Sequence, residues 1–138
     1  MTTEGARDLF TCIRRNHRLT HLIVDNNNMH SHYNFSAIEQ MIGGNSTMQF
    51  FSAQNCNLSD QFGVPFAIGL RSNKTLLKFN MKNNQIGSRT LSTLASSINQ
   101  GNQRLREFDL SRNCIDDNGG LKLPEMLQRN DELLKINL

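Results

Sequence analysis

The stretch that decides the fold is Leu76-Leu77-Lys78-Phe79-Asn80-Met81-Lys82-Asn83-Asn84-Gln85-Ile86. Apolar side chains occupy its first, fourth, sixth and eleventh places, and an asparagine occupies the ninth place. This spacing is typical of a short strand that buries one face and then turns sharply. We therefore predict a strand over residues 78–82, with a turn directly after it.

The same pattern occurs five times along the chain. Its first place falls at Leu19, Met48, Leu76, Leu105 and Leu133, in steps of 29, 28, 29 and 28 residues. The later places are filled by Leu22, Val24, Asn27 and Met29, then by Phe51, Ala53, Cys56 and Leu58, and then by Phe108, Leu110, Asn113 and Ile115. The fifth copy continues through Ile136 and reaches Leu138. A period this regular indicates stacked repeats, with strands near 21–25, 50–54, 78–82 and 107–111.

An asparagine stands three residues before each first place and confirms the period independently. These residues are Asn16, Asn45, Asn73, Asn102 and Asn130. Asparagine tolerates the left-handed backbone conformation that ends many helices, and its amide can bond free carbonyl groups. We expect both features at each of these positions.

Between the strands, apolar residues recur with helical spacing. The sets are Ala6, Leu9, Phe10 and Ile13; Phe35, Ile38, Met41 and Ile42; Phe66, Ala67 and Leu70; Leu91, Leu94, Ala95 and Ile98; and Leu123, Met126 and Leu127. Pro65 and Pro124 are expected in first helical turns, where proline is tolerated. The predicted order is a helix, then strand and helix four times, then a strand. Strands joined by helices in this way run parallel, with right-handed crossovers.

The predicted fold class is thus α/β: a right-handed solenoid forming a horseshoe arc, with about five parallel strands on the concave side and helices on the convex side. Residues 1–138 form one domain. The 28/29-residue alternation resembles the ribonuclease-inhibitor type of leucine-rich repeat over essentially the whole chain. That type includes ribonuclease inhibitors, the sensing arrays of NOD-like receptors, the Ran GTPase-activating protein and tropomodulin-like actin-filament proteins. The resemblance implies protein binding along the concave sheet and adjoining loops, although this chain is shorter than those arrays.

Composition points to a cytoplasmic protein without a membrane segment. Hydrophobic residues make up 37% of the 138 residues, which is enough for one buried core. No apolar run approaches the ~20 residues of a membrane span, and residues 1–10 lack the apolar core of a signal peptide. Cys12, Cys56 and Cys114 lie far apart in the sequence and cannot all pair, which suits a reducing compartment.

The positive charges do not indicate a nucleic-acid partner. The net charge is +3, and basic residues gather at 14–18 and 74–82, while Asp109, Asp116 and Asp117 are among the acidic residues that offset them. No aromatic residues that could stack on bases interleave with the basic ones. We interpret the charges as solvated surface.

No set of residues predicts an enzyme, a cofactor or a metal site. His30-Ser31-His32 has the spacing of a surface metal clip, but no Cys or carboxylate motif accompanies it. Gly43-Gly44-Asn45-Ser46-Thr47 lacks the lysine of a phosphate loop and is interpreted as a helix stop. Asp116-Asp117-Asn118-Gly119 lacks the remaining ligands of a calcium loop and is interpreted as a turn.

The repeat register instead predicts which side chains face a partner. The strand positions that point away from the helices are His21, Ile23, Asp25, Phe50, Ser52, Gln54, Lys78, Asn80, Lys82, Glu107, Asp109 and Arg112. Phe50 and Ile23 are the large apolar members and lie on adjacent strands, where they mark a contact or are isolated surface hydrophobes. The column Asn27, Cys56, Asn84 and Asn113 is predicted to be structural, bonding the main chain at the strand ends.

The sequence therefore favours a non-enzymatic protein-interaction module whose partner it does not identify. The alternatives are a small-GTPase regulator and an actin-filament regulator of the same repeat class. We also expect the apolar residues of the fifth strand to be covered, either in a homodimer or by further repeats, unless that strand is disordered. Light scattering over a hundredfold range of concentration tests the homodimer.

Overall fold

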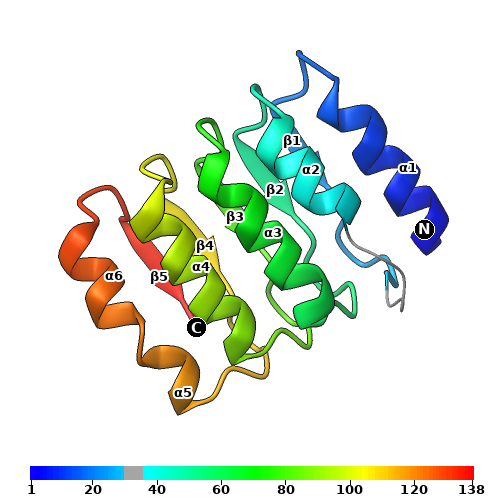
Figure 1. The fold of residues 1–138 in the computed structure, drawn as a ribbon. Helices are drawn as coiled ribbons and strands as arrows, with labels where there is room; N and C mark the ends of the chain where they lie inside the picture. Colours follow the sequence, from blue (N-terminus) through cyan, green and yellow to red (C-terminus); the bar gives the residue numbers. More distant parts are fainter. Residues whose placement is uncertain (30–35) are drawn as a thin grey trace.

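The computed structural model describes residues 1–29 and 36–138. The elements are α1 (Thr3–Arg14), β1 (His21–Ile23), α2 (Ser36–Gly44), β2 (Phe50–Ser52), α3 (Asp60–Ser72), β3 (Lys78–Asn80), α4 (Ser88–Gln100), β4 (Glu107–Asp109), α5 (Asp117–Gly120), α6 (Leu123–Arg129) and β5 (Lys135–Asn137). Successive repeats lie side by side along the molecule (Figure 1). Phe35 and the His30-Ser31-His32 segment lie outside the described residues.

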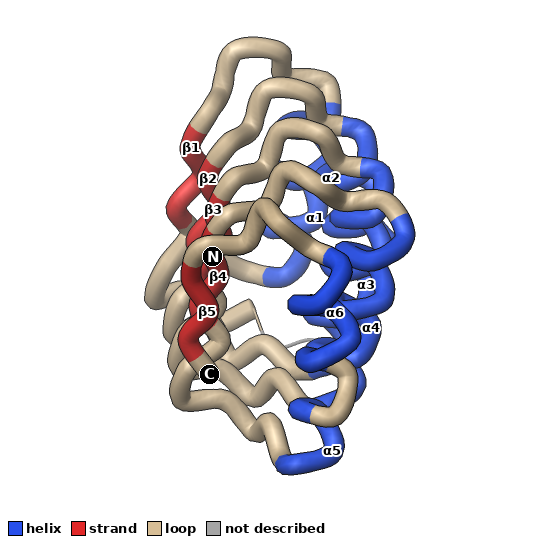
Figure 2. Tube along the Cα trace, turned by 90° about the vertical axis from the view of Figure 1, so that its left-hand side faces the viewer, coloured by secondary structure: helices blue, strands red, loops and turns tan. Residues whose placement is uncertain are grey.

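The five strands form one parallel sheet in the order β1-β2-β3-β4-β5. The strands occupy one layer and the helices the other (Figure 2). Each strand pairs with the next in the register that the repeat period predicts, so that His21, Phe50, Lys78, Glu107 and Lys135 form one row. The predicted fold class is confirmed.

Two details of the elements differ from the prediction. Each regular strand has three residues, because the turn begins earlier than the alternating pattern suggested. The helical segment before β5 is divided into α5 and α6, with Pro124 in the first turn of α6 as expected. Proline removes a backbone donor and clashes with the preceding turn, and the glycines at the end of α5 favour an interruption there.

Pro65 is not in a first helical turn, as we had expected, but inside α3. The helix begins earlier than its apolar residues indicated, because the Ser59 side chain accepts a hydrogen bond from the Gln61 backbone N–H and caps it. Proline at this position leaves the Gln61 carbonyl without its helical donor. Gln61 is exposed, so that water can reach this region.

A continuous series of phenylalanine rings joins the repeats through the core. Its members are Phe10, Phe51, Phe62, Phe66, Phe79 and Phe108, with ring centroids between 5.0 and 6.5 Å apart. They come from both layers, since Phe51, Phe79 and Phe108 lie on strands and the others on helices. These rings anchor the sheet to the helices that cover it.

The asparagines before each repeat bond the main chain as expected. The Asn73 Nδ2 group donates to the carbonyl oxygens of Ile42 (2.7 Å) and Asn45 (3.3 Å) in the preceding repeat. Its Oδ1 atom accepts from the backbone N–H groups of Thr75 and Leu76. Asn45 and Asn102 make the equivalent bonds. Each therefore fastens one repeat to the one before it.

The prediction of a left-handed conformation at these asparagines is wrong. Asn73 is extended, with φ −69° and ψ 134°. Positive φ instead occurs after the strands, at Asn26, Asn55, Asn57, Asn83 and Arg112. The tight turn lies there because the chain must leave the sheet soon after each strand, and four of these residues stand three positions beyond a strand end.

Candidate protein-binding surface

The side of the sheet that faces away from the helices forms a polar surface with one apolar corner. We call it the exposed sheet face. Its residues are His21, Ile23, Asp25, Phe50, Ser52, Gln54, Lys78, Asn80, Lys82, Glu107, Asp109, Arg112, Lys135 and Asn137. The parallel register brings together residues that are 28 or 29 positions apart in the sequence.

The apolar corner lies on β1 and β2. The rings of His21 and Phe50 contact each other with centroids 5.8 Å apart. Ile23 is 63% exposed, and its neighbour in the sheet is Ser52. An isoleucine this exposed loses the favourable free energy of burial, which a partner could restore. Neither Ile23 nor Phe50 is required to hold the core.

Ser52 is the predicted contact residue that the structure places out of reach. It is 2% exposed, and its hydroxyl donates to Asp25 Oδ1 at 2.6 Å. The same carboxylate oxygen accepts from the backbone N–H of Gln54. The Asp25 side chain thus reaches over the neighbouring strand β2 and covers Ser52. Asp25 and Gln54 remain partly exposed.

The other end of the face is charged. Lys78 Nζ pairs with Glu107 Oε1 at 2.8 Å, with both side chains partly exposed. Burial acts to raise the pKa of Asp109, but hydrogen bonds from the side chains of Ser111 and Asn137 outweigh it and hold the pKa below its ordinary value. The charge of Lys82 also lowers this pKa, so Asp109 is ionised at neutral pH.

An amide ladder borders the face where the chain turns away from the strands. The Nδ2 group of Asn55 donates to Asn26 Oδ1 (3.0 Å), and that of Asn83 donates to Asn55 Oδ1 (3.1 Å). All three residues are exposed. Arg112 takes the corresponding position in the next repeat and is also exposed, so a guanidinium ends this row.

The predicted structural column lies behind this border and bonds main-chain groups. The Nδ2 group of Asn84 donates to the carbonyls of Ala53 and Met81, while its Oδ1 atom accepts from the backbone N–H groups of Cys56 and Leu58. Asn27 bonds carbonyl groups of its own repeat, and Asn113 bonds main-chain groups of its own repeat and of the one before it. In Cys56 a thiol replaces the amide and contacts the carbonyl oxygens of Val24 (3.2 Å) and Gln54 (3.3 Å).

The three cysteines are expected to differ in reactivity. Burial raises the pKa of the Cys56 thiol, despite an opposing backbone hydrogen bond from Asn27, and the side chain is fully covered. Cys12 and Cys114 are exposed. Because the thiolate is the nucleophile, N-ethylmaleimide at pH 8 should modify two cysteines in the folded protein and all three in urea. Rapid labelling of Cys56 in the folded protein, detected by peptide mass spectrometry, would contradict this burial.

No metal or membrane site emerges from the described part of the chain. In residues 1–29 and 36–138, no three His, Cys, Asp or Glu side chains come together to hold a metal ion. No helix within these ranges is long and apolar enough to cross a membrane. The segment Asp116–Gly119 begins a short helix, in which the Asp116 carboxylate accepts from the Gly119 backbone N–H, as a helix cap does.

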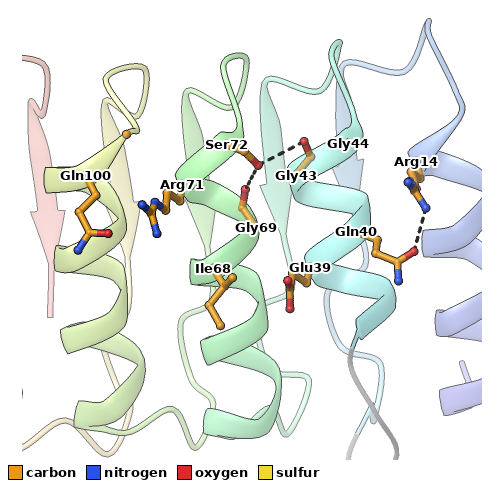
Figure 3. Close-up of a pocket in the computed structure, with 11 residues that line it drawn as sticks. Arg14, Glu39, Gln40, Gly43, Gly44, Ile68, Gly69, Arg71, Ser72 and Gln100 are labelled. Carbon is orange, nitrogen blue, oxygen red and sulfur yellow. Dashed lines mark hydrogen bonds between the residues drawn. The ribbon is translucent and has the colours of Figure 1, made fainter.

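A shallow hollow on the helix side results from close helix packing (Figure 3). A side chain at Gly69 would place its Cβ 2.5 Å from the Glu39 carbonyl oxygen, so α2 and α3 can approach only because this residue is glycine. Arg14 crosses part of the hollow and donates to Gln40 Oε1 at 2.9 Å. The shape of the hollow follows from these contacts, and we assign it no ligand.

A second groove was not found by sequence reasoning. It runs along the sheet edge where the chain passes from each helix to the next strand, and has a volume of about 360 Å³. His17, Arg18, Lys74 and Arg104 line it. The signal lay in the repeat register, because Arg18 and Arg104 occupy the same repeat position, directly before the first place of the pattern.

The fold is similar to that of two solved protein domains. The actin-binding site 2 of leiomodin-1 superposes with a TM-score of 0.78 and 19% sequence identity, over 97% of this chain and 77% of that one. The C-terminal domain of Caenorhabditis elegans tropomodulin superposes with a TM-score of 0.77 and 16% identity, over 99% of this chain and 81% of that one. No protein-family model matches the sequence, and no curated protein matches it. At these identities the likeness shows a fold of the leucine-rich-repeat type.

Proposed function

We propose that this protein is a non-enzymatic interaction module that binds a protein partner through the exposed sheet face and its adjoining loops. The observation that carries the proposal is the apolar corner, where Ile23 is 63% exposed beside the His21–Phe50 ring pair on an otherwise polar face. Aromatic and aliphatic anchors surrounded by polar side chains are typical of binding hot spots.

The size of the face indicates that adjoining loops contribute to binding. Five strands about 4.8 Å apart, with about four exposed residues each, give a face of roughly 20 by 13 Å, or roughly 500 Å² once the relief of the side chains is included. A stable interface needs about 800 Å² from each partner. The amide ladder and Arg112 border the face on one side and extend the available surface. A partner that contacts both the corner and this border buries more area than the sheet face alone provides.

Actin is the specific partner that the fold comparison favours. The leiomodin-1 domain of the same fold is described as an actin-binding site, and this chain covers 77% of it. We propose actin as the first partner to test and cytosol as the compartment. The repeat length further supports the ribonuclease-inhibitor type among leucine-rich repeats.

The expected result is that removing the apolar corner weakens binding without unfolding the protein. Monomeric and filamentous actin are tested by anisotropy and co-sedimentation, and other partners by crosslinking followed by mass spectrometry. Replacing Ile23→Ser and Phe50→Ala together should weaken binding at least about tenfold, which corresponds to about 1.4 kcal/mol.

The matched control removes two exposed leucines on the helix side. Leu121 is 72% and Leu127 49% exposed, and Leu121→Ser with Leu127→Ala should leave binding unchanged. Equal loss in both double variants would contradict the sheet-face proposal. If both double variants bind actin as the unmodified protein does, the contact lies elsewhere on the molecule. If actin does not bind, the same variants test the sheet-face proposal with the partners identified by crosslinking.

A further inference from the structure

We propose that the groove along the helix-to-strand edge of the sheet binds an acidic, extended peptide segment of a partner protein. We call it the edge groove, lined by His17, Arg18, Lys74, Thr75 and Arg104 among others. It lies at the edge where the strands begin and shares no lining residue with the apolar corner. The inference is therefore independent of the sheet-face proposal.

The groove collects positive charge from three repeats. Arg18 follows α1, Lys74 follows α3 and Arg104 follows α4, and all three are exposed. None of the described residues that line the groove is acidic. Within residues 1–29 and 36–138, no carboxylate pairs with Arg18, Lys74 or Arg104. Three unpaired cations in one groove produce a positive potential that attracts an anionic ligand.

Stabilisation of helix ends does not account for these charges. Cations are favoured near a helix C-terminus, but the effect is limited to the last turn. Arg18 and Arg104 lie four residues beyond the ends of α1 and α4, and the last turns of α2 and α4 contain no basic residue. Only Lys74 has a helix-end role, since its Nζ donates to the Gly101 carbonyl at 2.7 Å. The remaining cations therefore have no structural partner that explains them.

The spacing of the charges fits an extended chain. Arg18 and Arg104 belong to the first and fourth repeats, which are three inter-strand steps, or about 14 Å, apart. Lys74 lies in the third repeat, about 10 Å from Arg18 by the same spacing. Side chains on one side of an extended peptide recur about every 6.8 Å, so that acidic residues at positions i and i+4 lie about 14 Å apart, as Arg18 and Arg104 do.

The groove also offers hydrogen-bond donors to such a segment. The Thr75 hydroxyl oxygen is buried and has no hydrogen-bond partner among the described residues. A buried hydroxyl without a partner is unfavourable, and a ligand carboxylate or carbonyl in the groove could accept its hydrogen. Among the described lining residues, His17 is the single aromatic side chain, so the groove lacks the series of rings on which successive bases stack, which favours a peptide over a single-stranded nucleic acid.

The experiment measures the fluorescence anisotropy of a fluorescein-labelled 12-residue peptide of alternating Glu and Ser with the full chain. A peptide of alternating Lys and Ser is the charge control. Arg18→Gln with Arg104→Gln should weaken binding of the acidic peptide at least about tenfold. Arg89→Gln with Arg129→Gln, both exposed and outside the groove, makes the same change in net charge and should alter binding less than twofold.

The outcomes decide between a specific groove and general charge attraction. Equal weakening in both double variants, or no binding of the acidic peptide at 1 mM, would overturn the proposal. Tighter binding of a 12-nucleotide single-stranded DNA with the same dependence on Arg18 and Arg104 would also overturn it, in favour of a nucleic acid. The Ile23→Ser, Phe50→Ala variant should bind the acidic peptide normally, which separates this test from that of the sheet face. Thermal unfolding by circular dichroism confirms that each variant is folded.

Discussion

Replacing Phe51→Ala should lower the free energy of unfolding by about 3–5 kcal/mol, the largest effect expected of any single substitution considered for this protein. Phe51 is 0% exposed in the centre of β2. Its ring lies 5.5 Å from that of Phe66, 6.4 Å from that of Phe62 and 6.5 Å from that of Phe10. Truncation leaves a cavity among three aromatic rings from two helices, α1 and α3, and such rigid neighbours collapse poorly into the space.

The preceding residue supplies the control. Phe50 points to the opposite face of the sheet and is partly exposed, so Phe50→Ala should cost less than about 1 kcal/mol. Urea unfolding followed by circular dichroism measures both variants. Phe51→Ala should therefore affect stability, whereas Phe50→Ala should affect binding. Equal urea midpoints for the two would mean that the core series of rings does not carry the stability assigned to it.

The repeat period was sufficient to predict the fold and the composition of the exposed sheet face. Parallel strands of equal repeats pair in register, so counting 28 or 29 residues forward from His21 reaches its neighbour Phe50 and then Lys78. The same counting identified Asn84 and Asn113 as main-chain partners of adjacent turns. These predictions needed only the period and the alternation of strand side chains.

Features that depend on contacts between repeats could not be predicted in this way. Ser52 occupies an outward position, but Asp25 from the neighbouring strand reaches over it. The edge groove was missed because charge was balanced along the sequence, where Asp109 offsets the basic residues. In the molecule Asp109 lies on the sheet face and Arg18, Lys74 and Arg104 lie at the edge. The sequence was sufficient to give the net charge, but the positions of the charges on the surface required the structure.

Replacing Asn84→Ala should lower the free energy of unfolding by about 3 kcal/mol, and Asn113→Ala by about 1 kcal/mol. Asn84 is 8% exposed and serves two repeats at once. Its loss leaves the backbone N–H groups of Cys56 and Leu58 without the acceptor that they now share, at 2.9 and 3.0 Å. It also removes the donor to the carbonyls of Ala53 and Met81. Buried main-chain groups without partners keep the full cost of their removal from water.

The difference between the two asparagines follows from their surroundings. Asn113 is only partly buried, and its Oδ1 atom accepts from the Ile86 backbone N–H in a place closer to solvent, where water can replace part of what is lost. Gln85→Ala is the matched control, because Gln85 follows Asn84 directly, is exposed, and its side chain bonds only that of Asn57 among the described residues. It should change stability by less than about 0.5 kcal/mol. Urea midpoints measured for all three variants test this order. If Asn84→Ala unfolded at the same urea concentration as Gln85→Ala, water would already satisfy these turns, and the asparagine column would not hold successive repeats together.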